Sequence, residues 1–428
     1  MNRYKRFEEC GILRQMKCVI GVLTLLTGDM VIVRGGELSQ GDFVAVCGDS
    51  ITEQRRYSVF IEDYLLMCQP QKDLQVMQMG WNGEVTWGFI GRMGNDALPF
   101  KPTVFTTCFG MNDAGAGPEL EGRGERYRVA LDGIVNKFRA GGARWGVIGT
   151  PGAVDPAAYR GDAAGKNKAL AEVAAVAREV ARKNDLGFAD IHDLMMDVMA
   201  KAKAKYGPQY RVGGNDGVHP SLNGHLIMAY AFLKALKGNG EIGMIQFDMK
   251  TGQGSVSEGH TLLSASADGM EIESARYPFC FYGTPEDIMS TRGIIEFLPF
   301  NQDLNRFMLV VTHAPSDRMK ITWGKQTKTY SANELAKGIN LAAEFLDNPF
   351  SVPFAVVEKA VQEQQAFEVQ AVKNLLHPLY TWRELMPEFK ATYDQMQQTL
   401  IRRCAELRDK ARVAVVPVRH RIMIAPAK

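Results

Sequence analysis

Two short stretches of the sequence carry side chains suited to nucleophilic chemistry. Gly48-Asp49-Ser50 follows a short apolar run, and Asp216-Gly217-Val218-His219 lies far downstream. A serine between a strand and a helix exposes its hydroxyl, and a histidine near an aspartate can accept a proton while the carboxylate orients its other ring nitrogen. Each stretch alone has an ordinary interpretation, because Asp and Ser cap helices and Asp-x-x-His also occurs in solvated loops or metal sites.

Two further polar stretches follow the next apolar runs of the chain. The first is Gly80-Trp81-Asn82-Gly83, and the second is Gly110-Met111-Asn112-Asp113. Glycine and asparagine are common in turns, so either stretch alone is explained by a turn. Backbone N–H groups and an asparagine amide can also stabilise the negative charge that develops on a carbonyl oxygen during acyl transfer.

Taken together and in this order, the four stretches resemble those of the SGNH (GDSL-type) serine hydrolases over roughly residues 42–235. The resemblance implies a three-layer α/β/α fold of the flavodoxin-like kind, with a parallel sheet and an ester-cleaving site. It implies Ser50 as the nucleophile, and Asp216 and His219 as the acid and base. It also implies that Ser50, Gly83 and Asn112 donate to the oxyanion, and that no metal or organic cofactor is needed.

The chain departs from the family pattern at two positions, Gln78 and Met111, and neither change removes a catalytic group. Asp49 and Asp113 are interpreted as residues that order their turns. His192 in Ile191-His192-Asp193 competes with His219 for the role of base, but it lacks the Asp-x-x-His context.

The elements that must position these residues alternate apolar runs with helical patterns. Strands are predicted over residues 43–46, 74–79, 103–108, 144–148 and 186–191, with helical stretches at 57–65, 125–138 and 164–183. Continuous apolar strands in repeated β-α-β units indicate a parallel sheet covered by helices on both faces. Ligands of such sheets bind beyond the carboxyl ends of the strands, where the four polar stretches lie.

The texture of the sequence changes after residue 240. We predict a hydrolase domain over 41–240, a small β-rich antiparallel unit over 241–331 and a C-terminal helical segment over 332–428. Ser331 and Glu334 form a capping box that opens this segment. Apolar residues recur every three or four positions over 385–411, with Pro387 in the first turn, which predicts one long amphipathic helix that packs on the rest of the protein.

Residues 1–40 are predicted to be a leader. Basic residues precede the short apolar stretch from Met16 to Leu26, a pattern typical of a secretory signal. This pattern predicts a secreted or periplasmic protein. Because no clean cleavage site follows, the alternative is a cytoplasmic chain with an unusual leader.

Composition excludes several classes of protein. The 428 residues are 46% hydrophobic and 23% charged with a net charge of +2, which is typical of soluble globular proteins and favours neither nucleic acid nor an anionic membrane surface. No apolar run is long enough for a membrane span. Seven cysteines without a CxxC pair argue against a disulfide scaffold or a structural zinc site.

The substrate is predicted to be a small-molecule or glycan ester, most simply a carbohydrate O-acetyl ester. Trp81 and Trp87 flank the second polar stretch, where aromatic faces can stack on sugars, although tryptophans there are also ordinary packing residues. A lipid-ester or thioester hydrolase similar to lysophospholipases is the alternative, and a non-catalytic glycan-binding protein is a third. Oligomeric state and acyl chain length are not evident from the sequence.

Overall fold

The computed structural model describes residues 36–115 and 121–427. All of the elements described below belong to one compact unit. Positions 1–35 of the predicted leader lie outside the described residues, so the leader and export stay predictions.

A five-stranded parallel sheet forms the centre of the hydrolase part, with strand order β2-β1-β3-β4-β5. Its strands are β1 (Phe43–Gly48), β2 (Gln75–Gln78), β3 (Val104–Cys108), β4 (Trp145–Gly149) and β5 (Gly187–Ala189). Val44 of β1 pairs with Val76 and Val104 of its two neighbours. Every residue of β1, β3 and β4 is buried, as a sheet covered on both faces requires. The five predicted strands are confirmed.

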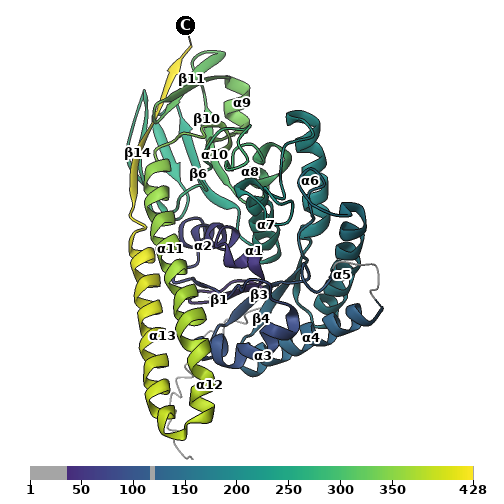
Figure 1. Cartoon of the computed structure of the whole chain (residues 1–428). Helices are drawn as coiled ribbons and strands as arrows, with labels where there is room; N and C mark the ends of the chain where they lie inside the picture. Colours follow the sequence, from purple (N-terminus) through teal and green to yellow (C-terminus); the bar gives the residue numbers. More distant parts are fainter. Residues whose placement is uncertain (1–35, 116–120, 428) are drawn as a thin grey trace, which may run out of the picture. The chain divides into compact units, whose positions relative to one another are not determined.

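Helices cover both faces of this sheet (Figure 1). They are α1 (Ser50–Glu53), α2 (Tyr57–Met67), α3 (Thr86–Asp96), α4 (Glu121–Ala140), α5 (Ala163–Lys183), α6 (Ile191–Tyr206) and α7 (Leu222–Ala235), with a 3₁₀ turn at Leu98–Phe100. α2 packs on α7 on one side, whereas α3, α4 and α5 pack in succession on the other. The predicted three-layer, flavodoxin-like α/β/α architecture is therefore confirmed.

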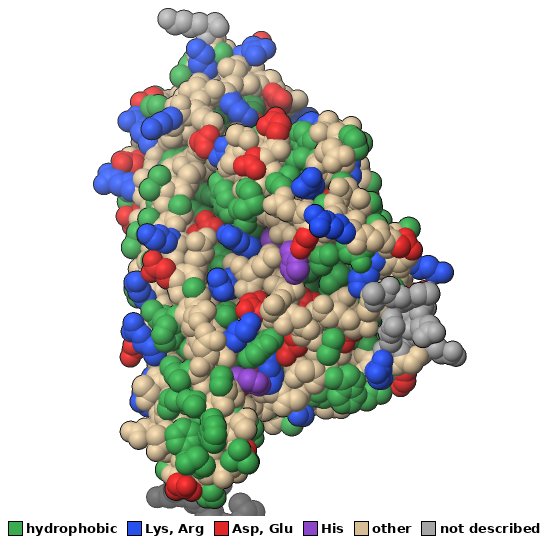
Figure 2. All heavy atoms as spheres, in the orientation of Figure 1, with side chains coloured by type: hydrophobic (Ala, Val, Ile, Leu, Met, Phe, Trp, Pro, Cys, Tyr) green, Lys and Arg blue, Asp and Glu red, His purple; other side chains and the backbone are tan. Residues whose placement is uncertain are grey.

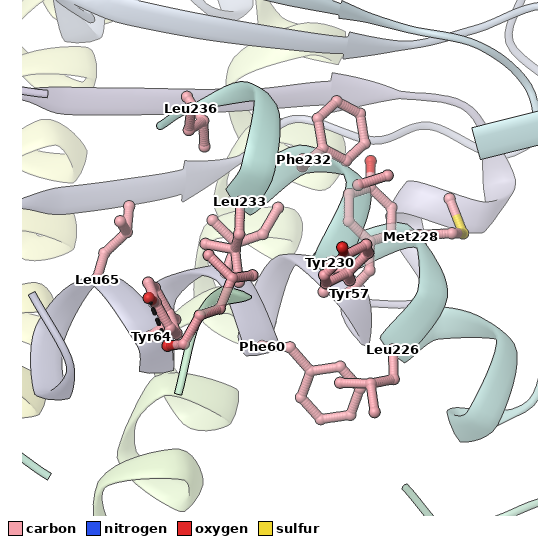
Figure 3. Packing of buried hydrophobic residues seen from close by; sticks show 14 of the residues in the cluster. Tyr57, Phe60, Tyr64, Leu65, Leu226, Met228, Tyr230, Phe232, Leu233 and Leu236 are labelled. Carbon is pink, nitrogen blue, oxygen red and sulfur yellow. Dashed lines mark hydrogen bonds between the residues drawn. The ribbon is translucent and has the colours of Figure 1, made fainter. Parts of the chain in front are cut away.

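The segment that follows β1, which comprises α1 and α2, is held in place by the packing of α2 on α7. Figure 3 shows aromatic side chains of α2 facing apolar side chains of α7. Tyr57 stacks on Phe232 with ring centroids 5.5 Å apart. The Tyr64 hydroxyl donates a 2.7 Å hydrogen bond to the Leu304 carbonyl oxygen. Burial of these large rings makes α2 a rigid support for the short helix α1 before it.

Two further sheets follow the hydrolase part. One has the order β13-β10-β6-β7 and the other β12-β11-β14-β9-β8. Their strands are β6 (Glu241–Asp248), β7 (Gln253–Val256), β8 (His260–Ser266), β9 (Gly269–Ser274), β10 (Arg306–Thr312), β11 (Arg318–Trp323), β12 (Gln326–Ser331), β13 (Ile339–Asn340) and β14 (Val418–Pro426). The β-rich character is confirmed, but β6 and β10 pair in parallel, so the unit is not wholly antiparallel.

The C-terminal segment is not helical to its end, which corrects the prediction for 332–428. β14 inserts between β9 and β11. Its residues alternate between buried and exposed, so that Val418, His420, Ile422 and Ile424 face the interior. This period of two is the pattern of a half-buried strand. The β-rich unit therefore needs the last residues of the chain to complete its sheet.

A chain of hydrogen bonds connects the two sheets through a buried histidine, His420, and a half-buried one, His260. The Trp323 indole N–H donates to His420 Nδ1 at 3.1 Å, and His420 Nε2 lies 2.9 Å from Ser274 Oγ. Ser274 Oγ lies 2.8 Å from His260 Nδ1, and His260 Nε2 lies 2.9 Å from the Ile242 carbonyl oxygen. Burial lowers the pKa of His420 to about 3, so this imidazole is neutral.

The remaining helices are α8 (Phe300–Asp303), α9 (Ala332–Lys337), α10 (Leu341–Glu344), α11 (Ser351–Ala371), α12 (His377–Leu385) and α13 (Lys390–Val413), with 3₁₀ turns at Ile295–Phe297 and Pro387–Phe389. The capping box of Ser331 and Glu334 is confirmed at α9. Within the described ranges, no helix has the length and apolar content needed to cross a membrane.

The predicted helix over 385–411 is interrupted at its start. α12 ends at Leu385, and Met386 adopts an extended conformation with φ −126° and ψ 92°. A residue before proline is disfavoured in the helical region, so Pro387 starts a separate turn and α13 begins at Lys390. The apolar stripe of α13 packs inward as predicted, with Tyr393, Cys404 and Ala411 buried.

The contact between α2 and α11 is unusually rich in buried carboxyl groups. Glu62 accepts hydrogen bonds from Gln364 and Gln365, at 2.8 and 2.7 Å. Asp63 is fully buried and neither of its carboxyl oxygens has a hydrogen-bond partner. Burial, followed by the charges of Glu358 and Glu62, raises the pKa of Asp63 well above its ordinary value of 3.8.

Asp63→Asn should flatten the dependence of stability on pH. The folded state retains the Asp63 proton at pH values where the unfolded chain has lost it, so wild-type stability falls as the pH rises above about 4. As the pH rises, the free energy of unfolding of the variant should increase relative to that of the wild type, by up to about 1.4 kcal/mol per pH unit, so that the variant becomes the relatively more stable protein. Denaturant unfolding between about pH 5 and pH 8 measures this. Parallel curves for the two proteins would contradict it, and exposed Asp197→Asn is the control.

Candidate active site

The end of β1 leads directly into the serine predicted to be the nucleophile. Gly48 closes the strand, and a Cβ at this position would come within 2.0 Å of Thr52 Oγ1, so the turn requires glycine. Asp49 then caps α1 by accepting a 3.0 Å hydrogen bond from the Ile51 N–H. Ser50 is therefore the first residue of a short helix, and the backbone before it is held by the close packing of Gly48 and by the Asp49 cap.

Ser50, His219 and Asp216 form one continuous hydrogen-bonded chain. Ser50 Oγ lies 2.8 Å from His219 Nε2, and His219 Nδ1 lies 2.7 Å from Asp216 Oδ2. The other carboxylate oxygen of Asp216 accepts the backbone N–H groups of Val218 and His219, both at 2.9 Å. A carboxylate bound to Nδ1–H leaves Nε2 as the acceptor that faces the serine.

The loop that carries His219 is held by Asp155, which follows β4. Its carboxylate accepts the Val212 N–H at 2.9 Å, and its own N–H donates to the Gly217 carbonyl oxygen at 2.8 Å. Lys203 of α6 forms an ion pair with the same fully buried carboxylate. These contacts attach the histidine loop to two elements of the core.

The predicted oxyanion donors lie on the loops after β2 and β3. Gly83 has φ +70°, a left-handed conformation that favours glycine. The Asn112 side-chain amide donates a 3.0 Å hydrogen bond to the Glu84 carbonyl oxygen, which links the two loops. An amide carries two N–H groups, so this bond uses only one donor of Asn112.

Three cavities adjoin these residues. One of about 430 Å³ is lined by Ser50, Glu53, Gln54, Arg55, Asn82, Asp216, His219 and Lys373. The second, of about 530 Å³, also has Gln54, Asp216 and His219 in its lining and includes Arg56, His225 and Met289. The third, of about 690 Å³, is lined by Val85, Trp87, Asn112, Asp113, Gly115, Arg126 and Tyr127. Ser50 and His219 thus share one cavity, and Asn112 opens on another.

Comparison with known proteins assigns the family. Residues 46–227 match the model of the GDSL-like Lipase/Acylhydrolase family, and the matched span contains all four polar stretches. This domain belongs to the GDSL-like lipase/acylhydrolases. The protein therefore contains an acylhydrolase domain, which makes it an enzyme. No curated protein sequence matches the chain.

Solved structures extend the likeness beyond the GDSL-like domain. BT4096, described as a gut microbial diltiazem-metabolizing enzyme, matches with a TM-score of 0.70 and 23% identity over 92% of this chain and 100% of its own. LAE5, an alpha/beta hydrolase enzyme from the metagenome of Lake Arreo in Spain, has 21% identity, a TM-score of 0.40 and covers 47% of this chain and 98% of its own. Axe2, an acetylxylan esterase from Geobacillus stearothermophilus, has 19% identity, a TM-score of 0.40 and covers 47% and 97%. The first match shows a shared fold over most of the chain.

Burial sets the electrostatics behind the site of the GDSL-like domain. Burial raises the pKa of Asp49 to about 7, against the hydrogen bond from Ile51. Burial also raises the pKa of Asp113, despite its hydrogen bonds from Thr86. For Asp216, burial is outweighed by the hydrogen bonds from His219 and Val218, and its pKa is lowered. Of these three carboxyl groups, only the exposed one, Asp216, has a lowered pKa, and it is the one hydrogen-bonded to His219.

Asp113 orders the turn beside Asn112, as predicted. Its Oδ1 accepts from the Thr86 N–H at 3.0 Å and from the Thr86 hydroxyl at 2.6 Å, at the start of α3. Its Oδ2 accepts from the Gly110 N–H at 3.2 Å. One carboxylate therefore joins the loop after β3 to the helix that follows the Gly83 loop.

The structure distinguishes the two candidate bases, His192 and His219, and the two tryptophans, Trp81 and Trp87. His192 is buried on α6 with Nδ1 2.9 Å from Asp193 Oδ1, and the imidazole bonded to Ser50 is that of His219. Trp87 is 48% exposed and lines the cavity of Asn112. Trp81 instead packs among charged side chains of the protein, with Arg92 over its ring at 4.8 Å.

Several residues of the site had no recognisable signal in the sequence. Lys373 comes from the C-terminal helical segment and lines the cavity of Ser50. His225 of α7 is fully buried and hydrogen-bonded to Gln54 Oε1 at 2.7 Å, and burial lowers its pKa to about 3. Among the described residues no group of three or more His, Cys, Asp or Glu side chains is arranged to hold a metal ion.

Asp113→Ala should destabilise the protein and lower its esterase activity. It removes three hydrogen bonds to a half-buried carboxylate, worth about 2–3 kcal/mol together, and frees the turn that carries Asn112. Thermal unfolding and kcat on a simple acyl ester measure the two effects. Asp197→Ala, which breaks an exposed pair with Lys201, is the matched control and should change stability by less than about 0.5 kcal/mol. Equal behaviour of the two variants would contradict this role.

Proposed function

We propose that the protein is a serine esterase that cleaves carboxylic esters through an acyl-enzyme, and that its natural substrate carries a short acyl group on a carbohydrate or similar polar alcohol. The observation that supports the mechanism is the hydrogen-bonded chain from Ser50 through His219 to Asp216. Ser50 is the nucleophile, His219 the general base and Asp216 the group that orients it. Ser50 N–H, Gly83 N–H and the Asn112 amide are the oxyanion donors.

The reaction then proceeds in two half-reactions. His219 Nε2 takes the proton of Ser50 as Oγ attacks the ester carbonyl, and the developing oxyanion is stabilised by the three donors. The imidazolium returns its proton to the leaving alkoxide, which departs as the alcohol. A water molecule, deprotonated by His219, attacks the acyl-enzyme, and the tetrahedral intermediate then expels Ser50 Oγ, which takes the proton back from His219 as the carboxylic acid is released.

Ser50→Ala should abolish turnover, by a factor on the order of 10⁶ in kcat, because no other oxygen is bonded to His219 Nε2 in the described structure. A fluorophosphonate should label wild-type protein at Ser50 and leave the variant unlabelled. His219→Gln should be inactive as well, whereas His192→Gln should retain turnover. Labelling of the Ser50→Ala variant at full strength would show that another residue is the nucleophile.

The surroundings of Ser50 support a short acyl group and a polar alcohol. The side chains around its cavity are charged or polar, including Glu53, Arg55 and Lys373. A long acyl chain needs a contiguous apolar surface, which these residues do not provide. Trp87, which is half exposed, lines the neighbouring cavity of Asn112, and an aromatic ring there is suited to packing against a sugar.

One observation favours the alternative of a lipid ester. Large apolar side chains gather on the surface near the junction of α12 and α13, and Figure 2 shows hydrophobic side chains at this end of the helical segment. They are Tyr380, Trp382, Leu385 and Met386, with exposures from 38% to 67%. Exposed patches of this kind can bind a lipid surface.

A substrate panel separates these possibilities. We expect acetylated sugars such as acetylated xylose to be hydrolysed with a higher kcat/KM than acyl esters of eight or more carbons, equally with and without EDTA. Diltiazem belongs in the panel because the name of BT4096 connects that enzyme with it. A tenfold preference for the long acyl ester, about 1.4 kcal/mol in transition-state binding, would favour the lipid alternative and contradict the short-acyl proposal.

A further inference from the structure

The C-terminal helical segment reaches the candidate active site through a π-helical turn. Residues Val372–Leu376 form this turn between α11 and α12. A π turn inserts an extra residue into a helix, and such turns are frequent at functional sites. Here the turn carries Lys373, whose side chain is 28% exposed and lines the cavity of Ser50 and His219.

Lys373 forms an ion pair with a residue of the nucleophile's own helix. Its Nζ lies 2.6 Å from Glu53 Oε1. The second carboxylate oxygen of Glu53 accepts the backbone N–H of Asn82. Because Glu53 belongs to α1 and Asn82 precedes Gly83, one carboxylate joins the helix of Ser50, the predicted oxyanion loop and the C-terminal segment.

Trp81, on the other side of Asn82, is held by the same segment. Lys373 Nζ lies 5.0 Å from the centroid of its ring, and the His377 ring packs edge-on at 4.8 Å. His377 is anchored in turn, since its Nδ1 lies 2.8 Å from Asp96 Oδ2 on α3. Trp81 is thus contacted by side chains from the π turn and from the start of α12, and the next residue, Asn82, is bound by Glu53 of α1, which the turn holds in place.

The charge around the cavity argues for a positioning role of Lys373. The two cations that line the cavity, Arg55 and Lys373, are matched by two carboxylates, Glu53 and Asp216. Lys373 is itself paired with Glu53, so the lining has no net positive charge for an anionic substrate. Gly83 is exposed and would leave a Cβ in open space, so its own packing does not hold it.

We propose that Lys373 is a positioning residue for the oxyanion loop, acting through the carboxylate of Glu53. The inference rests on the proposed function, because it assumes that the Gly83 N–H stabilises the oxyanion. The ammonium group fixes the Glu53 carboxylate, the carboxylate fixes the Asn82 N–H, and the following peptide then points the Gly83 N–H at the reacting carbonyl. The C-terminal segment is therefore part of the active site.

Lys373→Met tests this inference by removing the charge while keeping most of the apolar stem. We expect kcat on a short acyl ester to fall between about tenfold and a hundredfold with little change in KM, as for a misplaced catalytic group. Lys373→Arg should restore most of the activity. Glu53→Gln should reduce kcat similarly, and the double variant Glu53→Gln/Lys373→Met should be no worse than either single one.

The control is Lys410→Met, which breaks the exposed pair of Lys410 with Glu363 on the same helical segment, away from the site. Its kcat should equal that of wild type. Unchanged kcat in Lys373→Met, additive effects in the double variant, or an effect on KM alone would overturn the proposal, the last by making Lys373 a substrate-binding residue. If Lys373→Met does not fold, Lys373→Arg and Glu53→Gln decide by the same kcat criterion.

Fluorophosphonate labelling distinguishes failure of this inference from failure of the proposed function. If wild-type protein is not labelled at Ser50, the serine mechanism itself is wrong. If Ser50 is labelled in wild type and Lys373→Met reacts and turns over at the wild-type rate, only the positioning role is wrong. Slower labelling of Lys373→Met with a normal rate in Lys410→Met supports both.

Discussion

The hydrogen bond between Ser50 Oγ and His219 Nε2 joins the two ends of the GDSL-like domain, and much of the domain's local structure serves to hold its two partners at 2.8 Å. The serine side depends on the tight end of β1, where Gly48 leaves room for Thr52. The histidine side depends on Asp155, which attaches a glycine-containing loop to β4 and α6. A fixed donor–acceptor geometry requires rigid supports on both sides, because a displacement of about 1 Å greatly weakens catalysis.

Carboxyl groups in this protein differ in role according to their burial. Asp216 is exposed and strongly hydrogen-bonded, and its pKa is lowered. Asp49 and Asp63 are buried, and their pKa values are raised. Glu53 lies between these extremes, half-buried between a backbone N–H and the ammonium of Lys373. The C-terminal segment thus supplies counter-charge to the hydrolase domain as well as apolar packing.

The sequence predicted the parallel sheet and the four polar stretches because their signals are local. Apolar runs identify buried strands, and short motifs identify turns that carry chemistry. Lys373 could not be predicted, since its contact with Glu53 joins residues 320 positions apart and no motif surrounds it. β14 was missed because residues 418–424 alternate in burial but not in hydrophobicity, with polar His420 buried and apolar Met423 exposed, so the strand is recognised only with its neighbours β9 and β11. The break at Pro387 follows from local sterics and was open to prediction.

The buried hydrogen bonds from Trp323 to the Ile242 carbonyl oxygen run in one direction. Each member donates to the next, through His420, Ser274 and His260, so the donor and acceptor atom of every hydrogen bond in this series is determined. Replacing a single member with a group of different donor capacity would leave a buried polar atom without a partner. In related proteins these positions should therefore vary as a set, and an all-apolar set would be tolerated better than a chain broken at one residue.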